Sequence, residues 1–289
     1  MEWRVLVSGK MSPYMNMALD EAIYLSIIKR ESLPTLRFYD WEPASFSCGF
    51  NQNIDLELDF ERLKTSQYGF VRRPTGGRMV LHEEEVTYAV ISPLEGAMAG
   101  SISDTYFRIG KALLTGLKIM NVEAELSKGE LSQHEQRQPA NPCFTSSSRF
   151  ELTYKRKKLV GSAQTRNNTA FLQHGSILKT YNQKKVADFI PNINEDERLR
   201  IASLLERRTI SLQMILERDL TFNEVVNNLI SGFKEAWPED TFYLHETPTL
   251  VEKNTAEQLM HKKYATDQWN KKERKTQKEF DTYLSMKRI

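Results

Sequence analysis

Arg72-Arg73-Pro74-Thr75-Gly76-Gly77-Arg78-Met79-Val80-Leu81-His82 is the stretch of this chain that most constrains its fold. Paired glycines allow a backbone to bend sharply and to come close to a ligand. Arginines beside them favour a phosphate or another anion. The stretch lacks the Lys-Ser/Thr of a Walker loop and the G-x-G-x-x-G spacing of a dinucleotide-binding turn. Two interpretations stay open at this point: a ligand-binding turn, and a hairpin turn with solvated charges, which turn statistics alone favour.

A second unusual segment combines small residues with polar ones. Lys158-Leu159-Val160-Gly161-Ser162-Ala163-Gln164 is followed by Gln173-His174-Gly175-Ser176. Small side chains on a strand suit a site where a ligand lies flat against the backbone. A sheet position crowded by a neighbouring helix explains them equally well.

The sequence before the glycine pair predicts alternating helix and strand. Ser12-Pro13 is typical of a helix start, with proline at the first helical position. The three-to-four spacing of apolar residues in this helix places Asn16, Asp20 and Glu21 partly off its apolar stripe. Strand-like runs cover residues 35–39, 45–49, 69–73 and 86–91.

The remainder of the chain changes character twice. A helix capped by Ser103 or Asp104 is expected to run to about Met120, and residues 123–142 then form a long loop. Residues 150–179 predict a strand meander, and the chain is mostly helical from Gln183 onward. Its clearest helix begins at Thr221, with Glu224 three residues later as a capping box.

This order predicts an α/β (α+β) fold, a mixed β-sheet flanked by helices. We expect a mixed α/β catalytic core over residues 1–182 and a mainly helical C-terminal region over 183–289, packed on the same domain. The last 29 residues carry nine Lys or Arg against four Asp or Glu, so a basic tail is expected from about residue 271.

The composition excludes several classes of protein. The chain has 289 residues, of which 40% are hydrophobic, enough for a sizeable core. No apolar run approaches the roughly 20 residues of a membrane helix, and the N-terminus does not resemble a signal peptide. We therefore expect a soluble, cytoplasmic protein without a membrane partner. The net charge is only +2 and no nucleic-acid module accompanies the basic tail, so no nucleic-acid partner is expected.

The two cysteines have different settings. Cys48 lies in an apolar strand, where a buried small hydrophobe is its natural interpretation. Cys143 follows Asn-Pro at the end of the long loop, and Lys155, Lys157 and Lys158 come soon after it. A thiol becomes a nucleophile as the thiolate, near cations and partly exposed. Cys143 is thus the candidate nucleophile.

The histidines do not predict a metal site. None of the five stands in a His-Glu-x-x-His frame, and there is no Cys-x-x-Cys, so no metal is expected. His82 and His174 lie beside the glycine motifs, where each is more often a hydrogen-bonded strand residue than a base. Without a Gly-x-Ser-x-Gly elbow, serine-hydrolase chemistry has no support.

Together these motifs resemble a known superfamily. The run from Arg72 to His82, the Lys158 segment and Gln173-His174-Gly175-Ser176 are similar to the lipoate-protein ligase A and biotin-ligase superfamily. They resemble most narrowly the octanoyl-acyl carrier protein:protein octanoyltransferases that carry a nucleophile in a Cys-Phe step. The segments 16–21, 37–39 and 263–270 match as well, so the resemblance extends to about Asn270.

The resemblance implies a fold, a reaction and partners. The fold is a biotin/lipoate-protein ligase-like catalytic domain. Cys143 would take an octanoyl group from octanoyl-acyl carrier protein as a thioester, and Lys158 would activate the thiol and help deprotonate the acceptor lysine. The acceptor would be a lipoyl-carrier domain, such as the glycine cleavage H protein or a 2-oxoacid dehydrogenase E2, in lipoate biosynthesis. The implied substrate-binding residues are Arg72, Arg73, Gly76, Gly77, Arg78, His82, Gly161, Ser162, Ala163, Gln173, His174 and Gly175.

Three competing functions stay open beside the transferase. The first is an ATP-dependent lipoate-protein ligase, which would require ATP with Mg²⁺, whereas the transferase needs no cofactor. Ligases of the superfamily resemble Arg-Arg-x-x-Gly-Gly-Gly, but Arg78 stands at the third position here, and they lack the cysteine; both differences favour the transferase. The second is an octanoyl amidotransferase acting between carrier domains, and the third is a non-catalytic lipoyl-domain binding protein.

The arginines of the glycine stretch allow one further expectation. If acidic carrier domains dock at the acyl entrance, Arg72, Arg73, Arg78 and the 155–158 cluster would present positive charge there. In the opposite interpretation, the arginines only brace the glycine turn.

Overall fold

The computed structural model describes residues 1–127 and 151–271. Cys143 and nearly all of the basic tail expected from about residue 271 lie outside these ranges. In the first range the elements are β1 (Glu2–Met11), α1 (Pro13–Ile28), β2 (Thr35–Trp41), β3 (Ser45–Cys48), η1 (Ile54–Leu56), α2 (Phe60–Lys64), β4 (Gly69–Arg72), β5 (Val80–His82), β6 (Glu85–Pro93), η2 (Gly96–Met98), α3 (Ile102–Ile119) and β7 (Glu125–Ser127). In the second range they are β8 (Glu151–Tyr154), β9 (Lys157–Arg166), β10 (Ala170–Leu178), η5 (Gln183–Phe189), α4 (Glu195–Arg208), α5 (Leu212–Leu216), α6 (Phe222–Ala236), β11 (Thr241–His245), α7 (Leu250–Leu259), η6 (Met260–Tyr264) and α8 (Asp267–Asn270).

A mixed sheet forms the centre of the molecule, as the sequence predicts. Its order is β11-β1-β2-β6-β10-β9-β8-β7, with β11, β1 and β2 parallel and the following pairs antiparallel. A small sheet, β4-β3-β5, lies beside it. The expected strand meander is β8, β9 and β10, and every residue of β10 is buried.

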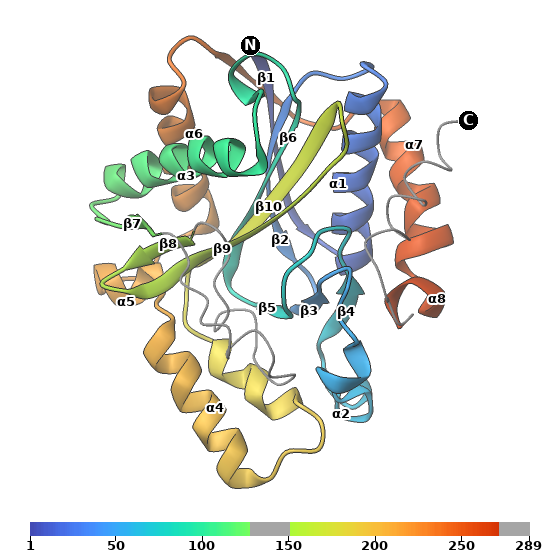
Figure 1. Cartoon of the computed structure of the whole chain (residues 1–289), viewed down its shortest axis with the longest axis vertical. Helices are drawn as coiled ribbons and strands as arrows, with labels where there is room; N and C mark the ends of the chain where they lie inside the picture. Colours follow the sequence, from blue (N-terminus) through green and yellow to red (C-terminus); the bar gives the residue numbers. More distant parts are fainter. Residues whose placement is uncertain (128–150, 272–289) are drawn as a thin grey trace.

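Helices cover both faces of the large sheet (Figure 1). On one face, α3 and α6 pack on the side chains of Phe38, Tyr88 and Val90. On the other face, α1 and α7 pack on Tyr39, Ala89 and Ile91, so neighbouring residues of one strand serve opposite cores. A third cluster joins the small sheet to η5 and α4.

Three sequence expectations need correction. Asn16, Asp20 and Glu21 are buried rather than at the edge of the apolar stripe, because α1 lies between the sheet and α7. Ser101 caps α3 and Asp104 is the third helical residue of its capping box, so the helix begins two or three residues earlier than expected. The long loop begins with strand β7, which pairs with β8.

The region after residue 183 also contributes to the central sheet. Strand β11 pairs in parallel with β1, a pairing 239 residues apart in sequence that the local pattern does not reveal. The helix predicted from Thr221 is α6, with Thr221 as its N-cap. The expected capping box is only half formed, because the Glu224 carboxylate pairs with Arg218 instead. No helix among the described residues is long and apolar enough to cross a membrane.

The crossing of α3 and α6 depends on two glycines. A Cβ on Gly232 would lie 2.2 Å from the Gly116 backbone nitrogen, well inside van der Waals contact. Gly232→Ala should therefore force the helices apart and lower the free energy of unfolding by about 1–3 kcal/mol, measured by urea denaturation. Ser231→Ala, on the exposed side of the same helix, is the control and should change it by less than about 0.5 kcal/mol. Equal stability of the two variants would contradict this packing.

Candidate active site

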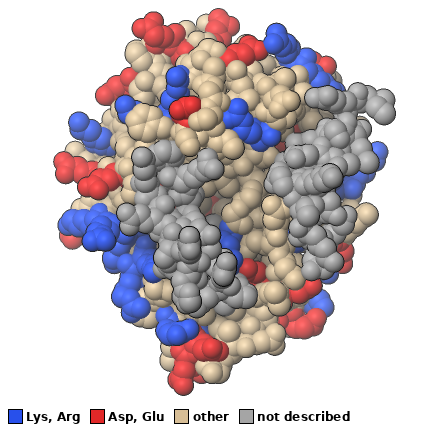
Figure 2. All heavy atoms as spheres, viewed as in Figure 1, with Lys and Arg blue, Asp and Glu red and all other residues tan. Residues whose placement is uncertain are grey.

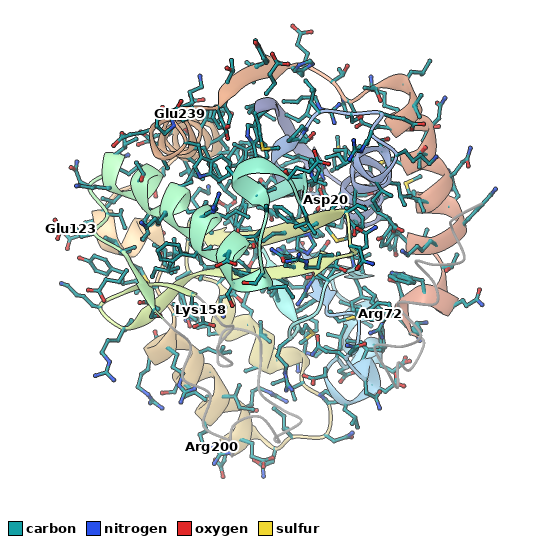
Figure 3. All side chains as sticks on the ribbon, turned by 45° about the horizontal axis from the view of Figure 1, so that its top comes forward. Asp20, Arg72, Glu123, Lys158, Arg200 and Glu239 are labelled. Atoms are coloured by element: carbon teal, nitrogen blue, oxygen red, sulfur yellow. The ribbon has the colours of Figure 1, made fainter. Side chains whose placement is uncertain are left out.

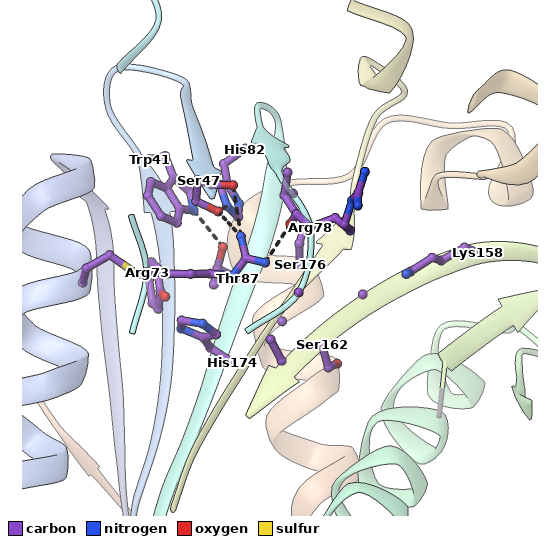
Figure 4. Close-up of a pocket in the computed structure, with 17 residues that line it drawn as sticks. Trp41, Ser47, Arg73, Arg78, His82, Thr87, Lys158, Ser162, His174 and Ser176 are labelled. Carbon is purple, nitrogen blue, oxygen red and sulfur yellow. Dashed lines mark hydrogen bonds between the residues drawn. The ribbon is translucent and has the colours of Figure 1, made fainter. Parts of the chain in front are cut away.

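A pocket lies where the glycine turn of the small sheet faces strands β9 and β10 (Figure 4). Its lining residues come from six strands, one helix and the turn, and most of them present carbon. They are Met17, Tyr39, Trp41, Ser47, Arg73, Gly77, Arg78, Val80, His82, Thr87, Lys158, Gly161, Ser162, Ala163, His174, Gly175 and Ser176.

The structure brings together most of the residues that the sequence singled out. Ten of the implied site residues line the pocket: Arg73, Gly77, Arg78, His82, Lys158, Gly161, Ser162, Ala163, His174 and Gly175. Gly76 and Gln173 lie next to lining residues and do not line it themselves, and Arg72 points elsewhere. Cys143 lies outside the described residues.

Gly49 and Gly77 are required by the local backbone geometry of the turn, whereas Gly76 has open space around its Cβ position. Gly77 has a φ of +93°, a conformation that favours glycine. A Cβ on Gly49 would lie 2.0 Å from the Gly77 carbonyl oxygen, so the β3 end and the turn touch through backbone alone. The turn is thereby pressed against the small sheet, with its other side toward the pocket.

Arg72 and Arg73 brace this turn rather than presenting charge to a partner. The buried Arg72 guanidinium donates to the carbonyl oxygens of Gly49, Phe50 and Gln52 and reaches α8 (Figure 3). The Arg73 guanidinium donates to the carbonyl oxygens of Ser47, Gly76 and Arg78 at 2.7–3.0 Å. Both side chains are buried, which corrects the expectation that they face an acidic carrier domain.

Arg78 is the arginine of the stretch that keeps its charged group at the pocket. Its guanidinium lies 3.2 Å from a carboxylate oxygen of Glu57. Burial raises the pKa of Glu57 to about 7, and the Arg78 charge opposes that rise.

One wall of the pocket is fixed by a carboxylate–histidine–hydroxyl chain. His174 Nδ1 lies 3.1 Å from Asp20 Oδ2, and its Nε2 lies 2.6 Å from the hydroxyl of Thr75. Burial would raise the pKa of Asp20, but the Arg37 guanidinium and the His174 contact together hold it below its usual value. Burial lowers the pKa of His174, so its imidazole is neutral, Nδ1–H donates to Asp20, and Nε2 accepts from Thr75.

A second chain of the same kind supports the opposite side. His82 Nδ1 lies 2.7 Å from Glu85 Oε1, and His82 Nε2 lies 2.7 Å from Ser47 Oγ. The His82 ring stacks on Trp41 at 4.0 Å between centroids. The sequence expected hydrogen-bonded strand histidines here, and this is their geometry. The sequence did not predict that Asp20, Thr75, Ser47 and Glu85 would be the partners of these histidines. The longest of these contacts, Asp20 to His174, spans 154 residues.

Lys158 lies at the other end of the pocket from His82 and Trp41 (Figure 4). It is buried, and its Nζ lies 2.7 Å from Glu151 Oε1 across the β8–β9 pair. The pairing of Glu151 with Lys158 was not predicted from the sequence, even though Glu151 lies only seven residues before Lys158 on the neighbouring strand. Cys48 is fully buried, and burial raises the pKa of its thiol to about 11, in agreement with its interpretation as a structural residue.

Exposed positive charge lies beside the pocket rather than in the glycine turn. Lys155 and Arg156 form the exposed β8–β9 turn, both with positive φ. Figure 2 shows blue side chains at the lower left, over this turn and α4. Among the described residues no group of three or more His, Cys, Asp or Glu side chains could hold a metal ion.

The neutral state of His174 predicts a pH dependence of stability. Below the ordinary histidine pKa of about 6.5 the unfolded chain binds a proton that buried His174 resists, so the free energy of unfolding should fall as the pH drops through 6.5 toward the lowered folded pKa. One such group contributes a slope of up to about 1.4 kcal/mol per pH unit. Urea denaturation between pH 7.5 and 5.5 should show a smaller slope for His174→Asn, whereas His245→Asn, at an exposed position in β11, should keep it. An unchanged slope in His174→Asn would show that His174 is not the group responsible.

Comparisons with known proteins agree with this geometry. The model of the lipoyl protein ligase A/B catalytic domain matches residues 12–234. Octanoyltransferase LipM of Kyrpidia tusciae is 38% identical over 276 residues, covering 93% of this chain and 98% of that protein. Octanoyltransferase LipM of Bacillus subtilis is 35% identical over 277 residues, with 93% and 98% coverage.

Solved structures give the same result for the fold. A bi-partite lipoate protein ligase from Thermoplasma acidophilum superposes with a TM-score of 0.76 at 25% identity, covering 96% of this chain and 99% of that one. A lipoate-protein ligase A bound with ATP superposes with a TM-score of 0.74 at 26% identity, covering 94% and 99%. The resemblance seen in the sequence is confirmed: the chain belongs to the lipoyl protein ligase A/B catalytic-domain family, among relatives that are octanoyltransferases.

Proposed function

We propose that this chain transfers an octanoyl group from octanoyl-acyl carrier protein, through a thioester on Cys143, to a lysine of a lipoyl-carrier domain in lipoate biosynthesis. The observation that carries the proposal is the pocket itself. Its glycine turn and its small-residue strand leave a carbon-lined space, and Lys158 is the one lysine among the described residues that line it. The octanoyltransferases in the comparison match this chain over nearly their whole length.

The proposed chemistry needs two protein groups. Cys143 as the thiolate attacks the carbonyl carbon of the donor thioester, a new C–S bond forms, and the carrier thiol leaves with a proton. The acceptor amine then attacks the acyl-cysteine, the amide C–N bond forms, and the Cys143 sulfur leaves and is reprotonated. Lys158 would stabilise the thiolate and help to move the amine proton, and Glu151 holds its Nζ in place at 2.7 Å.

The proposal requires no cofactor. Exchange of one thioester for another is nearly balanced in free energy, and formation of an amide from a thioester is downhill, so neither step needs ATP. Arg78 supports this choice because its side chain stands at the pocket in the position where ligases have glycine. The ATP-dependent ligase remains the second candidate, since a lipoate-protein ligase A bound with ATP has the same fold.

The partners follow from the same reaction. The donor is octanoyl-acyl carrier protein and the acceptor a lipoyl domain, of the glycine cleavage H protein or of a 2-oxoacid dehydrogenase E2. The similar ligase from Thermoplasma acidophilum acts with an E2 lipoyl domain. The exposed Lys155–Arg156 turn, two residues from Lys158 in sequence, is the positive surface that an acidic carrier would meet.

The assignment of the nucleophile predicts a covalent adduct. With octanoyl-acyl carrier protein and no ATP, intact mass spectrometry should show a hydroxylamine-sensitive octanoyl adduct. Cys143→Ala should abolish it. Cys48→Ala should keep it, because the Cys48 thiol is buried and its pKa of about 11 leaves almost no thiolate at neutral pH. An adduct that survives in Cys143→Ala would refute the assignment, and an adduct that forms only with ATP would favour the ligase.

The role of Lys158 predicts a change in thiol reactivity. A nearby ammonium stabilises a thiolate by Coulomb attraction, and each pKa unit corresponds to about 1.4 kcal/mol. In a Cys48→Ala background, Lys158→Ala should move the pH midpoint of iodoacetamide alkylation of Cys143 upward. The exposed Lys155→Ala is the matched control and should leave the midpoint where it is. An unmoved midpoint in Lys158→Ala would show that another group activates the thiol.

A further inference from the structure

A continuous chain of side-chain hydrogen bonds runs from helix α3 to the pocket. Gln164 Nε2 contacts Thr105 Oγ1 at 2.9 Å and Gln173 Oε1 at 3.0 Å. Gln173 Nε2 contacts the Tyr88 hydroxyl at 2.9 Å, and that hydroxyl contacts Ser162 Oγ at 2.7 Å. The reaction proposed above makes no use of this chain, although it ends on a pocket residue.

Helix α3 fixes which groups donate and which accept in this series of hydrogen bonds, beginning at Thr105. Thr105 Oγ1 lies 2.9 Å from the carbonyl oxygen of Ile102, an atom that can only accept. The single hydroxyl hydrogen of Thr105 is therefore used on the helix, and its oxygen must accept the contact from Gln164. An amide nitrogen, not an amide oxygen, must face Thr105.

Every later bond follows from this first one. The Gln164 nitrogen donates to the oxygen of Gln173, so the nitrogen of Gln173 donates to the Tyr88 oxygen. The single hydrogen of Tyr88 is then left to donate to Ser162 Oγ. Burial raises the pKa of Tyr88 to about 12, so this hydrogen is retained at neutral pH.

Ser162 therefore accepts one hydrogen bond and keeps its own hydrogen for the pocket. Its side chain is half-buried and lines the pocket wall. Within residues 1–127 and 151–271, no carbonyl or carboxylate oxygen accepts from Ser162 Oγ, since the Tyr88 hydroxyl is its one hydrogen-bond partner there. Thr105, Gln173 and Tyr88 are buried and Gln164 is half-buried, so water has little access to the hydrogen bonds that set this direction.

We propose that Ser162 is a catalytic residue: its hydroxyl donates a hydrogen bond to the carbonyl oxygen of the bound acyl group as negative charge develops on that oxygen during transfer. The inference rests on the proposed function. The strong hydrogen-bond acceptor of an octanoyl thioester is its carbonyl oxygen, so a fixed O–H donor in a carbon-lined pocket matches that atom and no part of the acyl chain. A donor held by a buried chain needs no reorientation when charge appears.

The placement along β9 is suited to this role. Lys158 and Ser162 are four residues apart on one strand, about 13 Å between Cα atoms. The Lys158 side chain reaches back toward the centre of the pocket, and Ser162 lies on the far side of that space (Figure 4). A thioester lying between them would have Lys158 toward its sulfur and Ser162 toward its oxygen.

The test is a comparison of kcat and KM for octanoyl transfer from octanoyl-acyl carrier protein to a lipoyl domain. Ser162→Ala should lower kcat by roughly 10²-fold, as expected for loss of one oxyanion donor, with KM changed less than about threefold. Ser162→Thr, which restores a hydroxyl, should recover most of the rate. Tyr88→Phe leaves Ser162 in place and removes the donor that orients it, so kcat should fall by about tenfold. Ser92→Ala, a buried serine of β6 that does not line the pocket, is the matched control and should keep the wild-type rate.

The outcomes separate this inference from the proposed function. If the wild-type chain forms no octanoyl adduct, the proposed function fails for every variant alike. If the wild type is active and Ser162→Ala keeps its kcat within about twofold, Ser162 is not catalytic. A raised KM at constant kcat would also overturn the inference, because it shows binding that is equal in the ground and transition states. Should Ser162→Ala fail to fold, Tyr88→Phe decides the matter, since an unchanged kcat in that variant refutes the hydrogen-bond chain.

Discussion

The buried carboxylate of Asp20 joins the parts of the chain that build the pocket. It accepts from Arg37 Nη1 at 2.6 Å, from the Tyr39 hydroxyl at 2.8 Å and from His174. Helix α1, strand β2 and strand β10 thus meet at one group, and His174 extends the connection to the glycine turn through Thr75. A lone buried carboxylate would be strongly unfavourable, so these donors are what make its burial possible. Because the donors come from separate elements, the carboxylate also fixes how those elements lie relative to one another.

The arginines of the glycine stretch perform a related task on the backbone. A turn that exposes several carbonyl oxygens to the protein interior needs donors from elsewhere, and a guanidinium supplies up to five. Arg72 and Arg73 fill this requirement, which is why two charged residues are found buried next to a glycine pair. Arg78, at the end of the turn, is placed to face the pocket instead. Identical residue types in one short run therefore serve two different purposes.

The sequence predicted those features that depend on local chemistry. The proline after Ser12 and the capping residue Thr221 each predict a helix start, and α1 and α6 begin there. The strand predicted around Gly161 to Ala163 is β9. The glycine pair was expected to let the backbone approach a ligand, and the structure shows a close approach of Gly77 to the backbone of Gly49, which was not predicted. Features set by distant partners were missed. Asp20 looks like a residue at the edge of an amphipathic helix until Arg37, Tyr39 and His174, up to 154 residues away, are known to lie against it. Ser47 and Thr75 are ordinary polar strand or turn residues unless His82 and His174 are known to lie opposite. Glu85 and Glu151 lie only three and seven residues from His82 and Lys158, and they were missed because a polar strand residue does not show by itself which side chain it faces.

The pocket is lined by residues that lie far apart in the sequence, and this affects how the pocket can form during folding. Ser47, His82, Ser162 and His174 reach the same space only after β3, β5, β6, β9 and β10 have come together. The register of β6 with β10 runs from Ala170 opposite Pro93 to Leu178 opposite Glu85, separations of 77 to 93 residues. Contacts of such sequence separation form slowly, because loop-closure entropy must be lost before they stabilise the chain. A partly folded chain with only α1 and its neighbouring parallel strands in place would therefore lack the pocket wall that β9 and β10 supply. The lining residues come from two stretches of the chain, 17–87 and 158–176, so neither stretch alone encloses the pocket.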